Sequence, residues 1–107
     1  MSLHLSVLTI GEMRKGIEML TDATRKAALH QWLSVDVPVY FSGRILPVDA
    51  QVCDRWGRML AAAGRPVPAI DSLLAATAVE HNLVLVTRNV KDFASLRVAT
   101  IDPWSVP

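Results

Sequence analysis

The run Leu83-Val84-Leu85-Val86-Thr87 restricts the possible folds more than any other part of the chain. A strand with one solvated face alternates apolar and polar residues, whereas a strand buried on both faces of a parallel sheet is apolar at consecutive positions. This run is therefore expected to be a strand that is buried on both faces. A sheet with helices packed on both of its sides is the architecture that this predicts.

Segments of strand and helix character alternate along the rest of the chain. Short strands are predicted at Leu5–Thr9, Ile45–Val48 and Val98–Ile101. Apolar spacings of three and four predict helices over Ile10–Leu20, Ala23–Val35, Ala50–Ala63 and Ala69–His81, with a short helical turn at Val90–Leu96. The order predicts a three-layer α/β/α fold with a mostly parallel sheet, as one domain over residues 1–107.

Four residues mark expected helix ends. Asp49 is a favourable N-cap for the helix that Gly64 closes. Asn82 is suited to a left-handed cap after the helix at residues 69–81. Pro38 should end or bend the helix that begins near Ala23, because proline has no N–H to donate.

Composition excludes several classes of protein. The chain is 51% hydrophobic with a net charge of +1, which excludes a disordered tail and a polyanion partner attracted by bulk charge alone. No apolar run is long enough to span a bilayer, and no signal peptide is recognisable. The single cysteine, Cys53, fits a reducing compartment, so a cytoplasmic location without membrane association is expected.

Acidic and amide side chains follow the strands or begin the helices. They are Glu12, Asp71, Asn89 and Asp92. Ligands bind at the carboxyl ends of strands in such sheets, and oxygen-only donors suit Mg²⁺ or Mn²⁺ rather than zinc. The alternative interpretation is structural, because acidic residues in a first helical turn interact favourably with the helix dipole and Asn or Asp is common in turns. From residue types and spacing alone, both interpretations remain open.

Several segments resemble PIN-domain ribonucleases, in particular VapC-type toxins of bacterial toxin–antitoxin pairs. Ser6, Thr9, Glu12, Gly16 and Ile17 have the spacing of the family's S-x-x-T-x-x-E-x-x-x-G-I segment. The other similar segments, in the family's order, are Gly43–Asp49, Pro68–Ala78, Leu85–Phe93 and Ile101–Trp104. The resemblance extends over most of the chain, although each segment alone is a weak signal.

The resemblance implies hydrolysis of RNA phosphodiester bonds with Mg²⁺ or Mn²⁺ as cofactor. Glu12 and Asp71 correspond to family acidic residues, and Asn89 and Asp92 share the role of the last one. Asp71, Glu12 and Asp92 are the implied metal ligands, and Thr87 would orient them. The implied partners are an antitoxin protein, an RNA substrate and a second copy of the chain.

One departure from the family bears on activity. The family opens with a strand that ends in an Asp-Thr-Asn-like motif, and no segment of this chain has that pattern. The chain is therefore expected to be a partial, N-terminally truncated PIN-like domain with weak or no ribonuclease activity. Three hypotheses follow: an endoribonuclease in which Asp22, Asp49 or a second subunit replaces the acid, an inactive antitoxin-binding module, and a structural remnant.

Basic and aromatic residues give two further expectations. Arg14, Lys15, Arg88 and Lys91 lie near the predicted site and are candidates for RNA contact, or else they form an ordinary solvated face. Trp32, Trp56 and Trp104 are expected to be core or dimer contacts. The expected dimer surfaces are the first helix, through Met13, Ile17 and Leu20, and the second, through Ala28 and Trp32.

Overall fold

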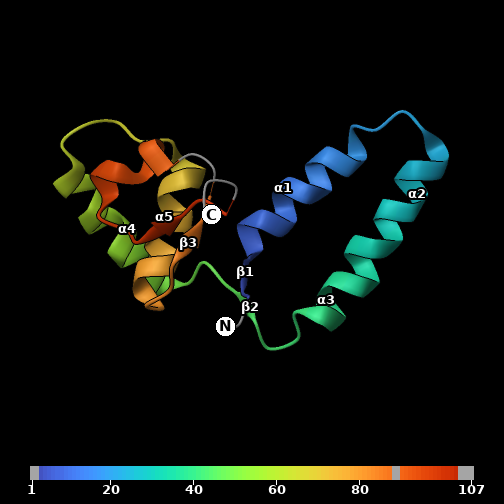
Figure 1. Ribbon diagram of the computed structural model, residues 1–107, viewed down its shortest axis with the longest axis horizontal. Coiled ribbons are helices and arrows are strands. Elements are labelled where there is room, and N and C mark those ends of the chain that lie inside the picture. The colour runs from blue at the N-terminus through green and yellow to red at the C-terminus, as the bar shows by residue number, and fades with distance from the viewer. Residues whose placement is uncertain (1–2, 88–89, 104–107) are drawn as a thin grey trace. The chain divides into compact units, whose positions relative to one another are not determined.

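The computed structural model describes residues 3–87 and 90–103. The chain divides into two compact units, Met1–Pro47 and Val48–Pro107, and each is described by itself (Figure 1). No helix in the described ranges is both long enough and apolar enough to cross a membrane. Trp104 lies outside the described residues, so its predicted contact role stays a prediction.

The first unit is a helical hairpin with a short parallel ladder. Its elements are β1 (Leu5–Ser6), α1 (Val7–Glu18), α2 (Ala23–Gln31), the π-helical segment η1 (Trp32–Asp36), α3 (Val37–Tyr40) and β2 (Ile45–Leu46). The helix α1 packs against the nearly continuous helix that α2, η1 and α3 form (Figure 1). Ile17, Leu33 and Val37 are the buried centre of this packing. Ile17 is therefore a core residue and not the free dimer contact that the sequence suggested.

The first helix begins earlier than predicted, so the strand prediction for Leu5–Thr9 is wrong after Ser6. Ser6 is the N-cap of α1, and its Oγ accepts a hydrogen bond from the backbone N–H of Leu8 at 3.0 Å. This bond satisfies one of the N–H groups that a helix start leaves without a partner. The alternation of apolar and polar residues at 5–9 thus spans a strand end and a helical turn.

Pro38 does not end the helix, contrary to one of the two expectations. The chain continues as α3 through Tyr40, and η1 lies immediately before it. In η1 the backbone N–H of Val37 donates to the carbonyl of Trp32, five residues earlier. A π-helical turn of this kind rearranges the ladder just before the residue that has no N–H, so the proline is accommodated within the helix.

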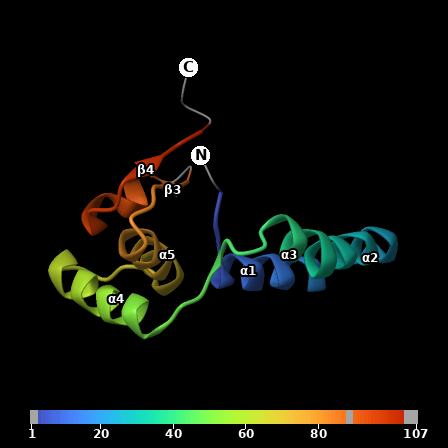
Figure 2. The same ribbon diagram turned by 90° about the horizontal axis from the view of Figure 1, so that it is seen from below.

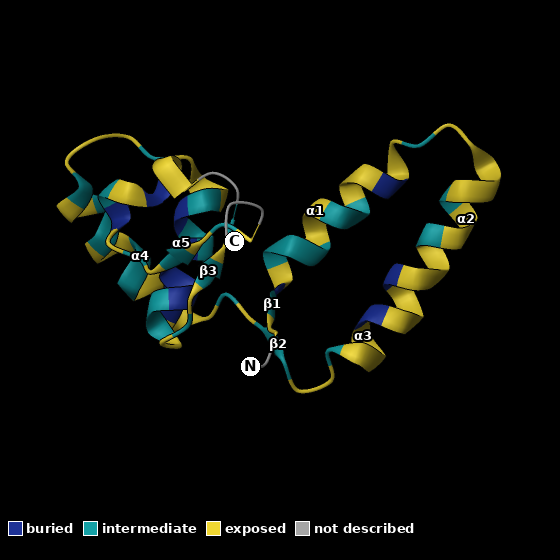
Figure 3. Ribbon diagram, in the orientation of Figure 1, coloured by how far each residue is buried: buried dark blue, intermediate teal, exposed yellow. Residues whose placement is uncertain are grey.

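The second unit contains two longer helices and another short ladder. Its elements are α4 (Ala50–Ala63), α5 (Ala69–Glu80), β3 (Leu85–Val86), the 3₁₀ helix η2 (Val90–Leu96) and β4 (Thr100–Ile101). Figure 2 shows α5 between α4 and the β3–β4 ladder. Ala75, Phe93 and Leu96 form the buried core, and the buried positions gather on α5 and η2 (Figure 3).

The predicted helix ends of this unit are confirmed. The Asp49 carboxylate accepts a hydrogen bond from the backbone N–H of Val52 at 3.0 Å. Gly64 ends α4 with a φ of 69°, and Asn82 follows α5 with a φ of 55°. Both φ values lie in the left-handed region, which Gly adopts freely and Asn tolerates better than most residues.

The strands form two separate parallel ladders in the described residues, β1 with β2 and β3 with β4. The predicted single sheet is thus wrong, although the α/β class with parallel strands is confirmed. Val84 and Val86 are 53% and 51% exposed, so the run at 83–87 is not buried on both faces. A ladder of two short strands offers little area for a second covering layer, and the apolar run here indicates strand preference rather than two-sided burial.

A buried hydroxyl joins the two main helices of this unit. Ser72 on α5 is 0% exposed, accepts a hydrogen bond from the indole N–H of Trp56 on α4 at 2.8 Å, and donates one to the Ala69 carbonyl at 3.0 Å. Trp56 is therefore a partly buried contact between two helices of the same unit, which fits the core alternative and not the dimer alternative. Trp32 is 41% exposed and is not a core residue.

Ser72→Ala should lower the free energy of unfolding by about 1–2 kcal/mol, because the indole N–H of Trp56 loses its acceptor. Urea unfolding followed by Trp fluorescence measures this loss. Ser42→Ala is the matched control, since Ser42 is exposed and outside any helix or strand, and it should change the free energy by less than about 0.5 kcal/mol. Equal effects of the two variants would show that the bond to Trp56 contributes nothing.

Candidate functional site

Asp71 lies in the first turn of α5 and is partly buried. The N-cap of this helix is Pro68, and no side chain caps it by a hydrogen bond. The Asp71 carboxylate therefore makes no capping hydrogen bond. The only structural role left for it is a favourable interaction with the helix dipole. Pro68 is suited to the start of α5, because a backbone N–H at this place would have no acceptor within the helix.

Most of the other acidic side chains have a structural partner. Asp22 accepts hydrogen bonds from the backbone N–H groups of Thr24 and Arg25 and so caps α2, as Asp49 caps α4. The acidic residues that form ion pairs with arginine or lysine are Glu18, Asp54 and Glu80, and Asp102 also has an interaction. Asp22 and Asp49 thus have capping roles that account for them without a metal.

The acidic residues that remain are Glu12, Asp36, Asp71 and Asp92. None of their four carboxylates has a hydrogen bond or ion pair with another residue within 3–87 or 90–103. All except Asp36 were singled out from the sequence as metal ligands. A carboxylate without a protein partner keeps both of its oxygen atoms available to a cation, so the structure leaves the predicted ligands chemically competent.

The predicted site residues are divided between the two units. Glu12 is exposed on α1 of the first unit, whereas Asp71, the partly buried Thr87 and the exposed Asp92 belong to the second. Asn89 lies outside the described residues. Among the residues that the structure does describe, no three His, Cys, Asp or Glu side chains form a group that could hold a metal ion. Convergence of the predicted ligands stays a prediction.

The candidate RNA-contact residues differ in whether they already interact with other side chains. Arg14 lies at 2.8 Å from His30 Nδ1, donates to Ser34 Oγ at 3.0 Å, and is 3.8 Å from Glu18. This network accounts for Arg14 as a link between α1 and the helix that follows. Lys15 and Lys91 are exposed, which RNA contact would require, and Arg88 lies outside the described residues.

A pocket of about 230 Å³ in the second unit was not among the sequence predictions. Three arginines line it, Arg55 and Arg58 from α4 and Arg97 after η2. The spacing of Arg55 and Arg58 places them on one helix face, which is the only signal in the sequence. Arg97 is distant along the chain and belongs to no motif, so its position could not be inferred.

The comparisons with known proteins agree with the fold. A family model described as the PIN domain matches residues 2–98. The toxin FitB of Neisseria gonorrhoeae is 35% identical over 94% of this chain and 75% of its own length. The VapC ribonuclease Y4jK of Sinorhizobium fredii is 29% identical over 96% of this chain and 76% of its own length.

Solved structures give the same result. The crystal structure of FitAcB from Neisseria gonorrhoeae superposes with a TM-score of 0.90 and 34% identity, covering 96% of this chain and 76% of that one. The DNA-bound VapBC structure from Salmonella typhimurium has a TM-score of 0.67 and 28% identity over 91% of this chain and 71% of that one. The segments from Ser6 to Phe93 that resemble PIN-domain ribonucleases lie within the matched residues 2–98, and the chain belongs to the PIN domain family.

Proposed function

We propose that this protein is a ribonuclease toxin of a toxin–antitoxin pair, which hydrolyses RNA phosphodiester bonds with Mg²⁺ or Mn²⁺ and is held by an antitoxin protein. Membership of the PIN domain family supports the nuclease chemistry. The names of the toxin FitB and of the VapC ribonuclease Y4jK support the biological role. The solved FitAB and VapBC relatives support the antitoxin as partner.

The observation that carries the proposal is the free carboxylate of Asp71. It is partly buried, it lies at a helix start, and no side chain or backbone group among the described residues satisfies it. A carboxylate at this place without a protein partner keeps both of its oxygen atoms available to a ligand. Its oxygen donors, with those of Glu12 and Asp92, fit a hard divalent cation better than they fit zinc.

The chain's own residues would divide the work as follows. Asp71, Glu12 and Asp92 would hold the cation, with Asn89 sharing the position of the last acid, and Thr87 would keep the ligands oriented. When bound, the divalent cation supplies charge stabilisation at the phosphate and lowers the pKa of a water molecule. Lys15, Lys91 and Arg88 would contact RNA phosphates on either side of the cleaved bond.

Asp71→Asn should raise the free energy of unfolding of the metal-free protein while it weakens metal binding. Like charges that are gathered in one site repel, and removal of one charge relieves that repulsion. Urea unfolding in EDTA measures the first effect, and a Mn²⁺ titration followed by electron paramagnetic resonance measures the second. We expect the affinity for Mn²⁺ to fall at least about tenfold, since a lost carboxylate ligand removes a charged contact.

Asp36→Asn is the matched control for both measurements. Asp36 also lacks a partner among the described residues, but it is exposed and no motif includes it. We expect this variant to leave metal affinity unchanged. A lower stability of metal-free Asp71→Asn, with unchanged Mn²⁺ binding, would assign Asp71 to the helix dipole and overturn the metal site.

The second candidate function is an antitoxin-binding module without cleavage. The solved FitAB and VapBC relatives support it, because binding of an antitoxin does not require cleavage. Co-expression with a candidate antitoxin protein, followed by gel filtration, tests the binding that both candidates share. The RNA cleavage assay then separates them, because only the ribonuclease loses an activity when Asp71 is replaced. If two copies of the chain associate, the apparent mass in the same gel filtration is larger by the mass of one chain.

A further inference from the structure

Two aromatic rings and a cation meet in the first unit, where the chain turns from α3 to β2. The centroids of the Tyr40 and Phe41 rings are 4.9 Å apart, and the ring planes are inclined by 72°. The Arg44 guanidinium carbon lies over both rings, 5.3 Å from the Tyr40 centroid and 5.2 Å from the Phe41 centroid. These three residues are called the aromatic turn. None of the predicted metal ligands belongs to it.

The backbone holds the aromatic turn in place. Gly43 has a φ of 75°, in the left-handed region that glycine adopts freely, and the next N–H, of Arg44, donates to the Phe41 carbonyl at 2.7 Å. The Arg44 guanidinium donates through Nη1 to the Leu3 carbonyl at 2.8 Å and through Nη2 to the Tyr40 carbonyl. The cation is therefore fixed over the two rings without any ligand.

The aromatic turn keeps both ring surface and charge accessible. Tyr40 is 63% exposed although Phe41 and Arg44 contact its ring. Within residues 3–87 and 90–103, Arg44 forms no ion pair with a carboxylate. Two of the five N–H donors of a guanidinium are used here, so three remain. The turn thus presents a flat apolar surface beside a cation whose charge is not neutralised.

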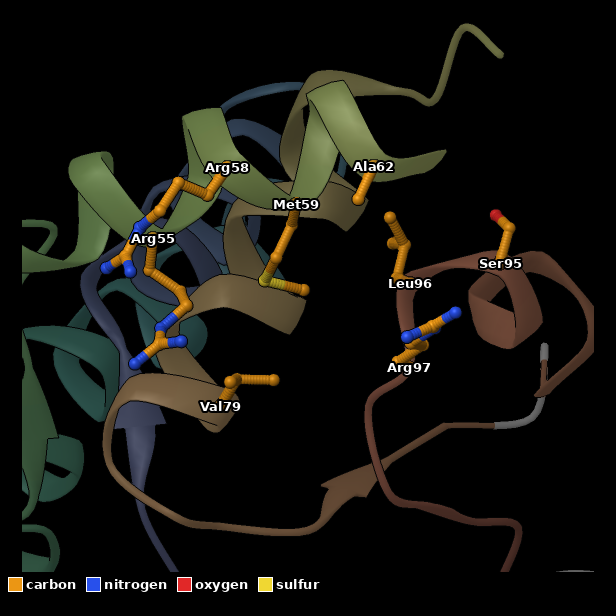
Figure 4. Close-up of a pocket in the computed structure, with 8 residues that line it drawn as sticks. All are labelled: Arg55, Arg58, Met59, Ala62, Val79, Ser95, Leu96 and Arg97. Atoms are coloured by element: carbon orange, nitrogen blue, oxygen red, sulfur yellow. The ribbon is translucent and has the colours of Figure 1, made fainter. Parts of the chain in front are cut away.

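The arginines around the pocket of the second unit are arranged differently. Figure 4 shows the guanidinium groups of Arg55 and Arg58 on the opposite side of that pocket from Arg97, so they do not converge on one ligand. Arg55 and Arg58 also have carboxylate partners. Among the described residues, both contacts between a cation and an aromatic ring involve Arg44.

We propose that the aromatic turn binds an unpaired base of a single-stranded RNA, with Tyr40 as the stacking surface and Arg44 beside the adjoining phosphate. Unpaired bases stack on aromatic rings, and a cation without a carboxylate partner attracts the phosphates. Because the ring is held before RNA binds, little side-chain entropy is lost when a base stacks on it. The proposal rests on RNA as the substrate of the proposed function, and it adds a contact that the metal ligands do not supply.

Tyr40→Leu tests the stacking surface, since it removes the ring and keeps an apolar side chain. Binding of the full chain to a fluorescein-labelled single-stranded RNA of about ten nucleotides is measured by fluorescence anisotropy in EDTA. We expect the affinity to fall at least about fivefold, and Tyr40→Phe, which keeps the ring, to bind within about twofold of the unaltered chain. Val39→Ala is the matched control, because Val39 is 73% exposed on the same helix and has no ring, and it should leave the affinity unchanged.

An RNA with abasic sites separates stacking from a general effect on the fold. This RNA keeps its phosphates but offers no base to the Tyr40 ring. The unaltered chain should bind it at least about fivefold more weakly than the RNA with bases, whereas Tyr40→Leu should bind the two RNAs about equally. Such coupling between a side chain and a base is the sign of direct contact, and a purely structural role of Tyr40 would not produce it.

Three results would overturn the proposal. They are equal affinity of the unaltered chain and Tyr40→Leu, equal loss in Tyr40→Leu and Val39→Ala, and a lack of saturable RNA binding in EDTA. Because EDTA removes divalent cations, none of them bears on cleavage, which the Asp71→Asn variant tests separately. Base-dependent binding through Tyr40 together with no cleavage by any version of the protein would reject the ribonuclease proposal and support the stacking contact.

Discussion

Asp71→Asn should lower the rate of Mg²⁺-dependent RNA cleavage by about a hundredfold to a thousandfold. Losing one preorganised charge that acts on the transition state commonly has an effect of this size. Because Mg²⁺ requires near-octahedral geometry and gives up its waters reluctantly, a neutral amide cannot restore the lost contact. The assay measures initial cleavage rates of a labelled RNA with excess Mg²⁺ and again in EDTA.

The comparison needs two versions of the protein. The 107-residue chain itself should cleave RNA weakly or not at all, because no segment in it has the Asp-Thr-Asn pattern. A version extended at its N-terminus by an apolar strand that ends in Asp-Thr-Asn should gain activity by a similar factor of about a hundred or more. The Asp71→Asn change is made in both versions, with Asp36→Asn beside it as the unaffected control.

Each outcome has a definite meaning. Cleavage by the 107-residue chain that Asp71→Asn abolishes would show that another residue replaces the missing acid. Cleavage that survives Asp71→Asn in both versions would reject Asp71 as a metal ligand, or reveal a contaminating nuclease. Gel filtration separates those two explanations, since the activity of a contaminant of different mass would elute apart from the protein.

Phe93→Ala should lower the free energy of unfolding by about 3–5 kcal/mol. Phe93 is 4% exposed and packs with Ala75 and Leu96 in the core of the second unit. Truncating it removes apolar contacts and leaves a cavity that helices fixed by their caps cannot close fully. Such a loss is a large part of the total stability of a chain of this size, so urea unfolding should shift to a clearly lower midpoint.

Tyr40→Ala is the control for loss of an aromatic ring. Tyr40 is 63% exposed, and its ring contacts only the Phe41 ring and the Arg44 guanidinium among the aromatic and cationic groups described. We expect a loss of at most about 1 kcal/mol from these exposed contacts. An equal loss in Phe93→Ala and Tyr40→Ala would contradict the assignment of Phe93 to a packed core.

Local signals in the sequence predicted the second unit better than the first. Asp49, Gly64 and Asn82 mark helix ends by their own side-chain or backbone chemistry, and the structure confirms all three. Ser6 has the same chemistry, but the alternating residues around it also fit a strand, so the start of α1 was missed. The change in the helical hydrogen bonds before Pro38 depends on the packing of Leu33 and Val37. That packing cannot be inferred from a short stretch of sequence.

The candidate site shows the same limit at the level of side chains. The sequence identified Glu12, Asp71 and Asp92 by their place after strands and at helix starts. It could not identify which acids already have partners, because the ion pair of Glu80 with Arg55 joins residues far apart along the chain. Only tertiary contacts separate such acids from those that remain available to a cation.

The buried stretch of α5 affects the direction in which the Asp71 side chain points. Ala75, Ala76, Thr77 and Ala78 are all buried, and successive residues of an α-helix point in directions about 100° apart. The helix is thus enclosed around its whole circumference just after Asp71 and cannot rotate about its axis without a clash on some side. These small residues therefore fix the rotation of α5 about its axis, and a larger side chain at Ala75 would change the direction of the Asp71 carboxylate one turn earlier.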